Sequence, residues 1–185
     1  MIDSSKAEQL VPVALAHSGW IAIELRRRLA HRIPKIVLCN WIVTDPPPAF
    51  KVVVKGLQDL NQWQQMRDRL FSLWLEGVDN PEATHFVRGI MGSASGEMWQ
   101  RSGREIEKDY AKAGNPMRAM AALSPALPVL HLCQLEPHVP AWTLQEEFAA
   151  SHPWFHPHRL HAKGHFAAFE IPEEMARLIE AFVAD

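Results

Sequence analysis

Residues 14–20, Ala-Leu-Ala-His-Ser-Gly-Trp, predict a sharp turn from a buried strand into a helix. The run Leu10–Leu15 that leads into them is short and apolar, as a buried parallel strand is. From Trp20 onward, apolar residues recur at the spacing of one helix face. A turn this tight needs small residues close to its centre, and the segment supplies them: Ala14, Ser18 and Gly19.

The centre of this turn carries no nucleophile. In enzymes built on a strand-to-helix elbow, a serine stands on strained backbone in a small-x-nucleophile-x-small register. The central position here is Ala16. Ser18 does not replace it, because Trp20 would then fall where a small residue must pack. We therefore expect the shape of such an elbow without serine-based acyl chemistry.

Three apolar runs predict neighbouring strands of one parallel sheet: Leu10–Leu15, Lys35–Cys39 and Pro128–Cys133. A helix joins the first two, which makes a β-α-β unit. A helix over Ala141–Ala150 follows the third run. The chain then predicts a short strand at Arg159–His161, a loop over residues 162–165 and a last helix begun by Pro172.

A long, mainly helical segment from about residue 45 to residue 124 separates the second and third strands, and it opens with three consecutive prolines. Its first clear helix places five large apolar residues on one face: Trp63, Met66, Leu70, Phe71 and Trp74. A second helix is expected over Glu97–Lys112. We assign residues 1–44 and 121–185 to a core and residues 45–120 to a helical cap.

Composition narrows the function classes. A net charge of −2 with mixed signs gives no reason to expect a nucleic-acid partner. The polar start and the absence of a long apolar run argue against a signal peptide and a membrane span. Cys39 and Cys133 lie in apolar strands, which favours buried free thiols and a cytoplasmic location. The histidines and cysteines lack metal-ligand spacing, so we expect no metal site.

The order of these elements resembles the C-terminal half of an α/β-hydrolase fold, with a cap inserted after its sixth strand. Nothing in the chain supplies the first four strands of that fold. The strand Leu10–Leu15, which is central in the intact fold, would then lie at an edge of the sheet. An unpaired apolar edge invites pairing with another chain. We therefore expect the chain to pair this edge with another copy in a homo-oligomer, to cover it with its own residues 1–9, or to aggregate.

The residues also resemble one family, the cofactor-free dioxygenases that cleave the ring of 3-hydroxy-4(1H)-quinolones. The resemblance covers residues 10–183 almost without gaps. Each motif is weak alone, but eight in the same order are specific: His17–Trp20, Asn40–Trp41, Asp59–Trp63, Leu70–Gly77, Arg101–Glu107, Gly114–Met117, His152–Phe155 and His165–Phe166.

The resemblance implies a reaction and a base. His165 matches the histidine that removes the 3-hydroxyl proton of the substrate, after which O2 adds to the electron-rich ring and carbon monoxide is released. The implied ligands are a small planar heteroaromatic molecule and O2, without a metal or an organic cofactor. Asn40 stands where the family has the aspartate that orients this histidine, so we expect Asn40 to accept a hydrogen bond from Nδ1 of His165.

Four further positions match residues that line the family's substrate site. Ala16 replaces a serine that positions the substrate, and His17 matches a histidine that contacts it. Trp74 matches a cap tryptophan that lines the cavity. Trp41 is expected either in the pocket wall or in the core.

Two other functions stay open from the sequence. One is an α/β-hydrolase that acts on ester or amide bonds, with Glu136 in the place where hydrolases keep their acid; Ala16 argues against it. The other is a catalytically silent, truncated homologue, since the Asp-to-Asn and Ser-to-Ala differences remove polar groups from the site.

Overall fold

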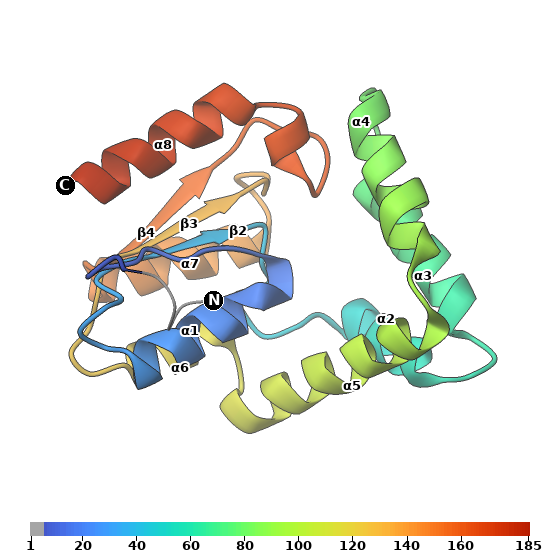
Figure 1. Ribbon diagram of the computed structural model, residues 1–185, viewed down its shortest axis with the longest axis horizontal. Helices are drawn as coiled ribbons and strands as arrows, with labels where there is room; N and C mark the ends of the chain where they lie inside the picture. The colour runs from blue at the N-terminus through green and yellow to red at the C-terminus, as the bar shows by residue number, and fades with distance from the viewer. Residues whose placement is uncertain (1–5) are drawn as a thin grey trace.

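The computed structural model describes residues 6–185. Residues 1–5, part of the polar start that argued against a signal peptide, lie outside the described residues. Four parallel strands form one sheet in the order β1-β2-β3-β4, as Figure 1 shows. Their bounds are β1 Val13–Leu15, β2 Ile36–Cys39, β3 Val129–Cys133 and β4 Phe155–Arg159. The expected four-stranded parallel sheet is confirmed.

The fourth strand lies earlier in the chain than expected. It spans Phe155–Arg159 rather than Arg159–His161. Pro157 lies inside it, and a proline normally argues against a strand because it lacks a backbone N–H. The structure accommodates Pro157 because β4 is an edge strand, paired only with β3.

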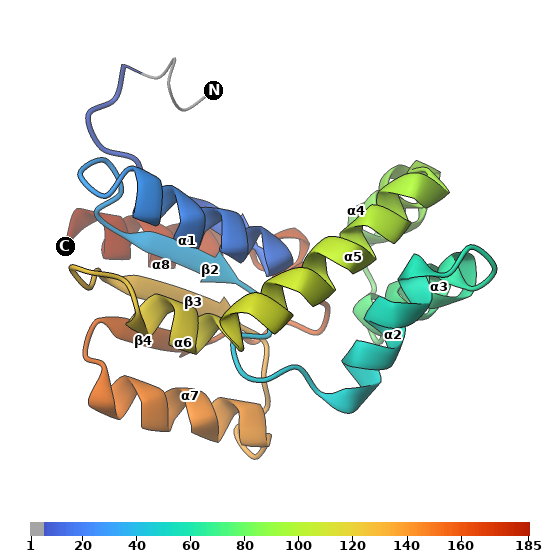
Figure 2. The ribbon, with the colours of Figure 1, turned by 90° about the horizontal axis from the view of Figure 1, so that it is seen from below.

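Helices cover both faces of the sheet (Figures 1 and 2). On one face lie α1 (Gly19–Arg28), α6 (Pro116–Ala121) and α7 (Pro140–Ser151), whose apolar side chains pack in one cluster with Leu38 and Val129. On the other face, α8 (Pro172–Ala184) packs against the alternate residues of β2 and β3. Successive residues along β2 and β3 therefore point alternately toward the α1, α6 and α7 layer and toward α8.

The cap helices lie to one side of the sheet, beyond the ends toward which the strands run (Figures 1 and 2). They are α2 (Pro48–Gln58), α3 (Trp63–Trp74), α4 (Pro81–Thr84), a π-helical segment (His85–Ile90), a 3₁₀ turn (Met91–Ser93) and α5 (Gly96–Ala113). Pro48 is the first residue of α2, a position where the missing N–H of proline costs no hydrogen bond. Phe166, from the last loop of the core, completes the apolar cluster between these helices.

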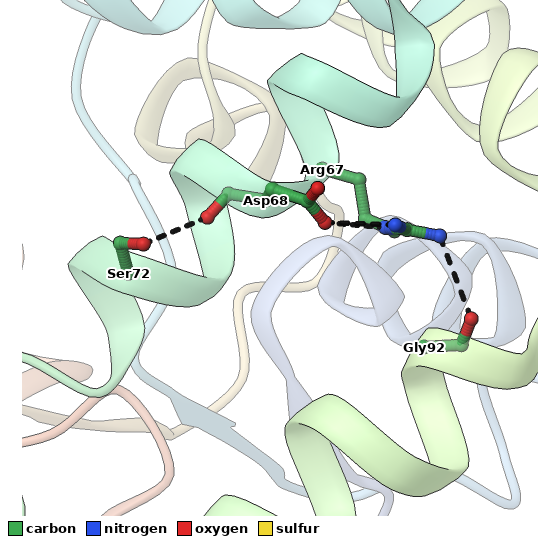
Figure 3. A network of polar contacts seen from close by, with 4 residues as sticks. All are labelled: Arg67, Asp68, Ser72 and Gly92. Carbon is green, nitrogen blue, oxygen red and sulfur yellow. Dashed lines mark hydrogen bonds and ion pairs between the residues drawn. The ribbon is translucent and has the colours of Figure 1, made fainter.

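A polar contact joins α3 to the 3₁₀ turn of the cap (Figure 3). Arg67 pairs with Asp68 at 2.8 Å and donates a hydrogen bond to the carbonyl of Gly92 at 3.5 Å. Its guanidinium also lies over the rings of Trp63 and Phe71, at 5.3 and 5.6 Å from their centroids. The cap thus has internal contacts of its own besides its apolar cluster.

The elbow strand β1 is an edge strand, as expected. The carbonyl of Pro12 accepts a hydrogen bond from the N–H of Val37, so the main-chain groups of residues 12 and 14 face β2. Those of Val13 and Leu15 consequently face the free edge. Their side chains are 54% and 40% exposed, which leaves an apolar strip along this edge, where the carbonyl of Leu15 accepts from the Ser18 hydroxyl.

Two negative findings apply to residues 6–185. No helix there combines the length and the apolar character needed to cross a bilayer. No group of three or more His, Cys, Asp or Glu side chains there is arranged to hold a metal ion. Cys39 and Cys133 are both buried and free, and burial raises the pKa of the Cys39 thiol to about 11.

Candidate functional site

The elbow between β1 and α1 is strained and tightly packed. Ala16, its central residue, has a φ of 48°, a left-handed conformation that residues with a Cβ rarely adopt. A Cβ on Gly19 would lie 2.2 Å from the Trp41 ring, so only glycine fits there. Ser18 donates its hydroxyl to the carbonyl of Leu15 at 2.7 Å. The turn therefore has the geometry of a nucleophile elbow and an alanine at its apex.

His17, the next residue, points toward the cap. Its imidazole stacks on Phe50 at 5.3 Å and meets Tyr110 edge-on at 5.9 Å. Burial lowers the pKa of His17 to about 4, and the nearby charge of His165 adds to the effect. Its Nε2 is buried, and no group of residues 6–185 forms a hydrogen bond with it. Such an atom is ready to accept or donate a hydrogen bond to a ligand.

His165 lies in the loop between β4 and α8. Its imidazole stacks on Trp74, the last residue of α3, with ring centroids 5.2 Å apart and planes 15° apart. Phe166 meets it edge-on at 5.0 Å. Burial lowers the pKa of His165 to about 4, so the imidazole is neutral at neutral pH. The structure thus brings together His165 and Trp74, which lie far apart in the sequence.

Asn40 holds the main chain of the His165 loop, and the expected contact with the imidazole is wrong. The Asn40 amide nitrogen, Nδ2, donates to the carbonyl of His165 at 2.6 Å. Its Oδ1 accepts a hydrogen bond from the N–H of Gln134 at 3.0 Å. Both ends of the amide therefore bond backbone groups, and neither bonds the imidazole. Asn40 itself has a φ of 44°, a conformation that asparagine tolerates better than most residues.

The two tryptophans assigned to the site differ in position. Trp74 is half-buried and stacks on His165, so it remains a candidate for contact with a substrate. Trp41 is 4% exposed and packs in the core cluster beneath Gly19 and against Trp20. Of the two roles left open for Trp41, the structure favours the core. Glu136 is exposed in the loop after β3.

Sequence reasoning missed a buried polar pair behind the site. His131, fully buried on β3, accepts a hydrogen bond at Nε2 from the N–H of Trp41, so its Nδ1 carries the proton and donates to Oε1 of Gln145 at 2.6 Å. Burial lowers the pKa of His131 to about 4. Tyr110, whose hydroxyl donates to the carbonyl of Ile42 at 2.7 Å, was missed too. The one available signal was that His131 is polar within an otherwise apolar run; Tyr110 lies in a charged stretch that gave none.

No protein-family model matches the chain. Individual relatives do. A 2-heptyl-3-hydroxy-4(1H)-quinolone dioxygenase of Mycobacteroides abscessus is 36% identical over 178 residues, which is 95% of this chain and 66% of the relative. A 2-heptyl-3-hydroxy-4-quinolone dioxygenase of Rhodococcus erythropolis is 36% identical over 99% of this chain and 68% of its own. A 1H-3-hydroxy-4-oxoquinoline 2,4-dioxygenase of Pseudomonas putida is 31% identical over 98% and 69%. The chain therefore spans about two thirds of the length of these relatives.

Solved structures agree with these matches. The dioxygenase AqdC, in complex with the product of ring cleavage of the Pseudomonas quinolone signal, superposes with a TM-score of 0.91 at 35% identity, over 100% of this chain and 70% of AqdC. The structure of 1H-3-hydroxy-4-oxoquinoline 2,4-dioxygenase gives 0.93 at 32% identity, over 98% and 69%. An enol-lactonase of Burkholderia xenovorans, at 17% identity and a TM-score of 0.73, shares the fold alone. This chain has the α/β-hydrolase fold, represented by about two thirds of its usual length, and belongs to the family of the 3-hydroxy-4-quinolone dioxygenases.

Proposed function

We propose that this chain contributes the general base and the cap of a dioxygenase that cleaves the ring of a 3-hydroxy-4-quinolone. The observation that carries the proposal is His165, a buried, neutral imidazole stacked on the cap residue Trp74. Relatives at 31–36% identity carry names that specify this reaction class. A substrate that is planar and aromatic suits a site built from stacked rings.

The low pKa of His165 fits a base that acts only when the substrate is present. An imidazole whose pKa is about 4 is unprotonated at neutral pH and can accept a proton. The imidazolium would be costly in this buried position without a nearby negative charge. Deprotonation of the substrate supplies that charge, because the proton of the 3-hydroxyl moves to His165 and leaves an oxyanion beside it. O2 then adds to the electron-rich ring, and collapse of the resulting peroxide releases carbon monoxide.

The test is O2 uptake and carbon monoxide release with 3-hydroxy-4-quinolone and its 2-heptyl derivative. We expect turnover by the wild-type chain and a loss of at least about a hundredfold in His165→Ala, since general-base catalysis contributes factors of this order. The matched control is His161→Ala, which removes an exposed histidine next to the same loop. Equal rates in the wild type and His165→Ala would remove His165 from the mechanism. No turnover in any variant would favour a catalytically silent homologue.

We further propose that the free edge of β1 is where copies of the 185-residue chain associate when nothing else covers it. Val13 and Leu15 offer exposed apolar side chains and outward-facing backbone groups there. The opposite edge, β4, contains Pro157 and polar side chains at His156, His158 and Arg159, which protect it.

Size-exclusion chromatography with light scattering tests this assembly. The wild type should associate, and Val13→Lys should shift the chain toward monomer. Val52→Lys is the matched control, because Val52 is 60% exposed on the cap. A wild-type monomer with fast amide exchange at residue 13 would contradict the assembly and leave the catalytic proposal untouched.

A further inference from the structure

The loop that carries His165 has every main-chain polar group of residues 163–165 hydrogen-bonded. The carbonyl of His165 accepts a hydrogen bond from Asn40, and the N–H of His165 donates to the carbonyl of Trp74 at 3.3 Å. The other four groups belong to Lys163 and Gly164. They are bound by the side chains of two residues to which no role has been given so far, Glu170 and Gln134.

Glu170 binds the two N–H groups of the loop. Its Oε1 accepts from Gly164 at 2.7 Å and its Oε2 accepts from Lys163 at 3.1 Å. A carboxylate that accepts two backbone hydrogen bonds makes stronger contacts than a neutral acceptor. Gly164 permits this approach, because a Cβ there would lie 3.0 Å from Oε1 of Glu170 and 3.1 Å from the Trp74 carbonyl.

Gln134 binds the two carbonyls. With its amide nitrogen facing the loop, as the partners require, it donates to Gly164 at 2.6 Å and to Lys163 at 2.8 Å. The backbone N–H of Gln134 in turn donates to Oδ1 of Asn40. Residues that follow β2 and β3 thus hold the loop on one side, and Glu170 holds it from the start of the last helical region.

The imidazole of His165 depends on this loop for its orientation. Among the described residues, its ring stacks on Trp74 and meets Phe166 edge-on, and its nitrogens take part in no hydrogen bond. A dedicated carboxylate would normally fix the ring through Nδ1. Here the position of the main chain must do so instead.

We propose that Glu170 and Gln134 are positioning residues that hold the His165 imidazole against Trp74, in place of a carboxylate on the imidazole itself. The proposal rests on the role of His165 as base. It assigns to Glu170 and Gln134 no contact with substrate. Loss of either side chain frees two main-chain groups and lets the loop, and the ring with it, move away from Trp74.

The experiment compares Glu170→Ala and Gln134→Ala with the wild type and with Glu173→Ala, an exposed carboxylate in the first turn of α8. In Glu170→Ala, hydrogen exchange at the amides of Lys163 and Gly164 should accelerate about ten- to a hundredfold, the factor expected for losing hydrogen bonds to a charged group. The NMR-detected pKa of His165 should rise from about 4 toward its ordinary value as the ring gains solvent. Glu173→Ala should change neither quantity.

The catalytic readout is separate. Glu170→Ala and Gln134→Ala should both lower kcat and leave KM nearly unchanged, because neither residue touches the substrate. Faster exchange and a raised His165 pKa without quinolone turnover in the wild type would support the positioning role and contradict the proposed function. Unchanged exchange and an unchanged His165 pKa in both Glu170→Ala and Gln134→Ala would overturn the positioning role, whatever the activity.

Discussion

The elbow at residues 16–19 and the loop at residues 163–165 carry the two histidines of the candidate site and are held in opposite ways. The elbow is held by packing: Ala16 is strained, Gly19 lies against the Trp41 ring, and Nε2 of His17 bonds no group of residues 6–185. The loop is held by hydrogen bonds to all its main-chain groups. The elbow should therefore be sensitive to added volume, and the loop to reversed polarity.

Lowering the pH should destabilise both regions, and its effect on the free energy of unfolding should be the largest of those predicted here. His17, His165 and His131, which lies between them in the sheet, have folded-state pKa values of about 4 against about 6.5 when unfolded. The unfolded chain then binds more protons, so stability is fully present above pH 6.5 and is lost as pH falls toward 4. Each histidine should cost about 2 kcal/mol between pH 7 and pH 5.

Urea unfolding at pH 7, 6 and 5 measures this loss. His17→Gln and His165→Gln should each remove about one histidine's share of it, which would show that elbow and loop contribute alike. His138→Gln, at an exposed position, is the control. A free energy of unfolding that is constant from pH 7 to pH 5 would contradict the burial of these imidazoles.

Added volume at the elbow should have the next largest effect. Gly19→Ala places a methyl group 2.2 Å from the Trp41 ring, inside the core cluster. Alanine normally stabilises a helix by about 1 kcal/mol over glycine, but overpacking on a rigid ring should outweigh this and destabilise by about 3 kcal/mol.

Thermal or urea unfolding compares this variant with Gly92→Ala, where the nearest side-chain atom would lie at an ordinary 3.6 Å. Gly92→Ala should be nearly neutral. Equal stability of Gly19→Ala and the wild type would mean that the elbow is not held by packing against Trp41.

Reversed polarity at the loop should have a somewhat smaller effect. Asn40→Asp keeps the size and tolerates the same backbone conformation, but it turns the donor Nδ2 into an oxygen that faces the His165 carbonyl at 2.6 Å. We expect a loss of about 2 kcal/mol in stability and a lower turnover rate. The family that the chain resembles has an aspartate here, and a carboxylate that reached the imidazole would instead raise activity.

Urea unfolding and O2 uptake measure whether Asn40→Asp lowers or raises stability and turnover rate. Asn61→Asp makes the same chemical change at an exposed position and should alter neither. Higher activity in Asn40→Asp would show that residue 40 can reach the imidazole after all.

For serine-hydrolase activity at the elbow we expect no signal at all. The elbow has the geometry of a serine hydrolase without its nucleophile, so a fluorophosphonate probe should leave the wild type unlabelled and p-nitrophenyl esters should not turn over. Ser18→Ala should behave like the wild type, because the Ser18 hydroxyl is donated to the Leu15 carbonyl. Stoichiometric labelling at Ser18 would mean that residue 18, and not residue 16, stands at the nucleophile position of the elbow.

Local features of the chain were predictable from sequence because each depends on neighbours within a few residues. The face of Trp63, Met66, Leu70, Phe71 and Trp74 predicts a helix, and α3 spans Trp63–Trp74. The run of small residues around Ala16 predicts the tight turn that the structure shows. The parallel sheet follows from apolar runs separated by helices.

The tertiary structure alone decided which groups meet. Asn40 and His165 are 125 positions apart, and whether the amide of Asn40 reaches the imidazole or the carbonyl depends on the path of the loop by a few ångströms. Pro157 could be placed inside β4 only once β4 was known to be an edge strand. Glu170 and Gln134 carry no sequence signal, since their partners are main-chain groups that every residue possesses. Periodicity records which side of an element is apolar, whereas a hydrogen bond between distant segments depends on how all the elements pack.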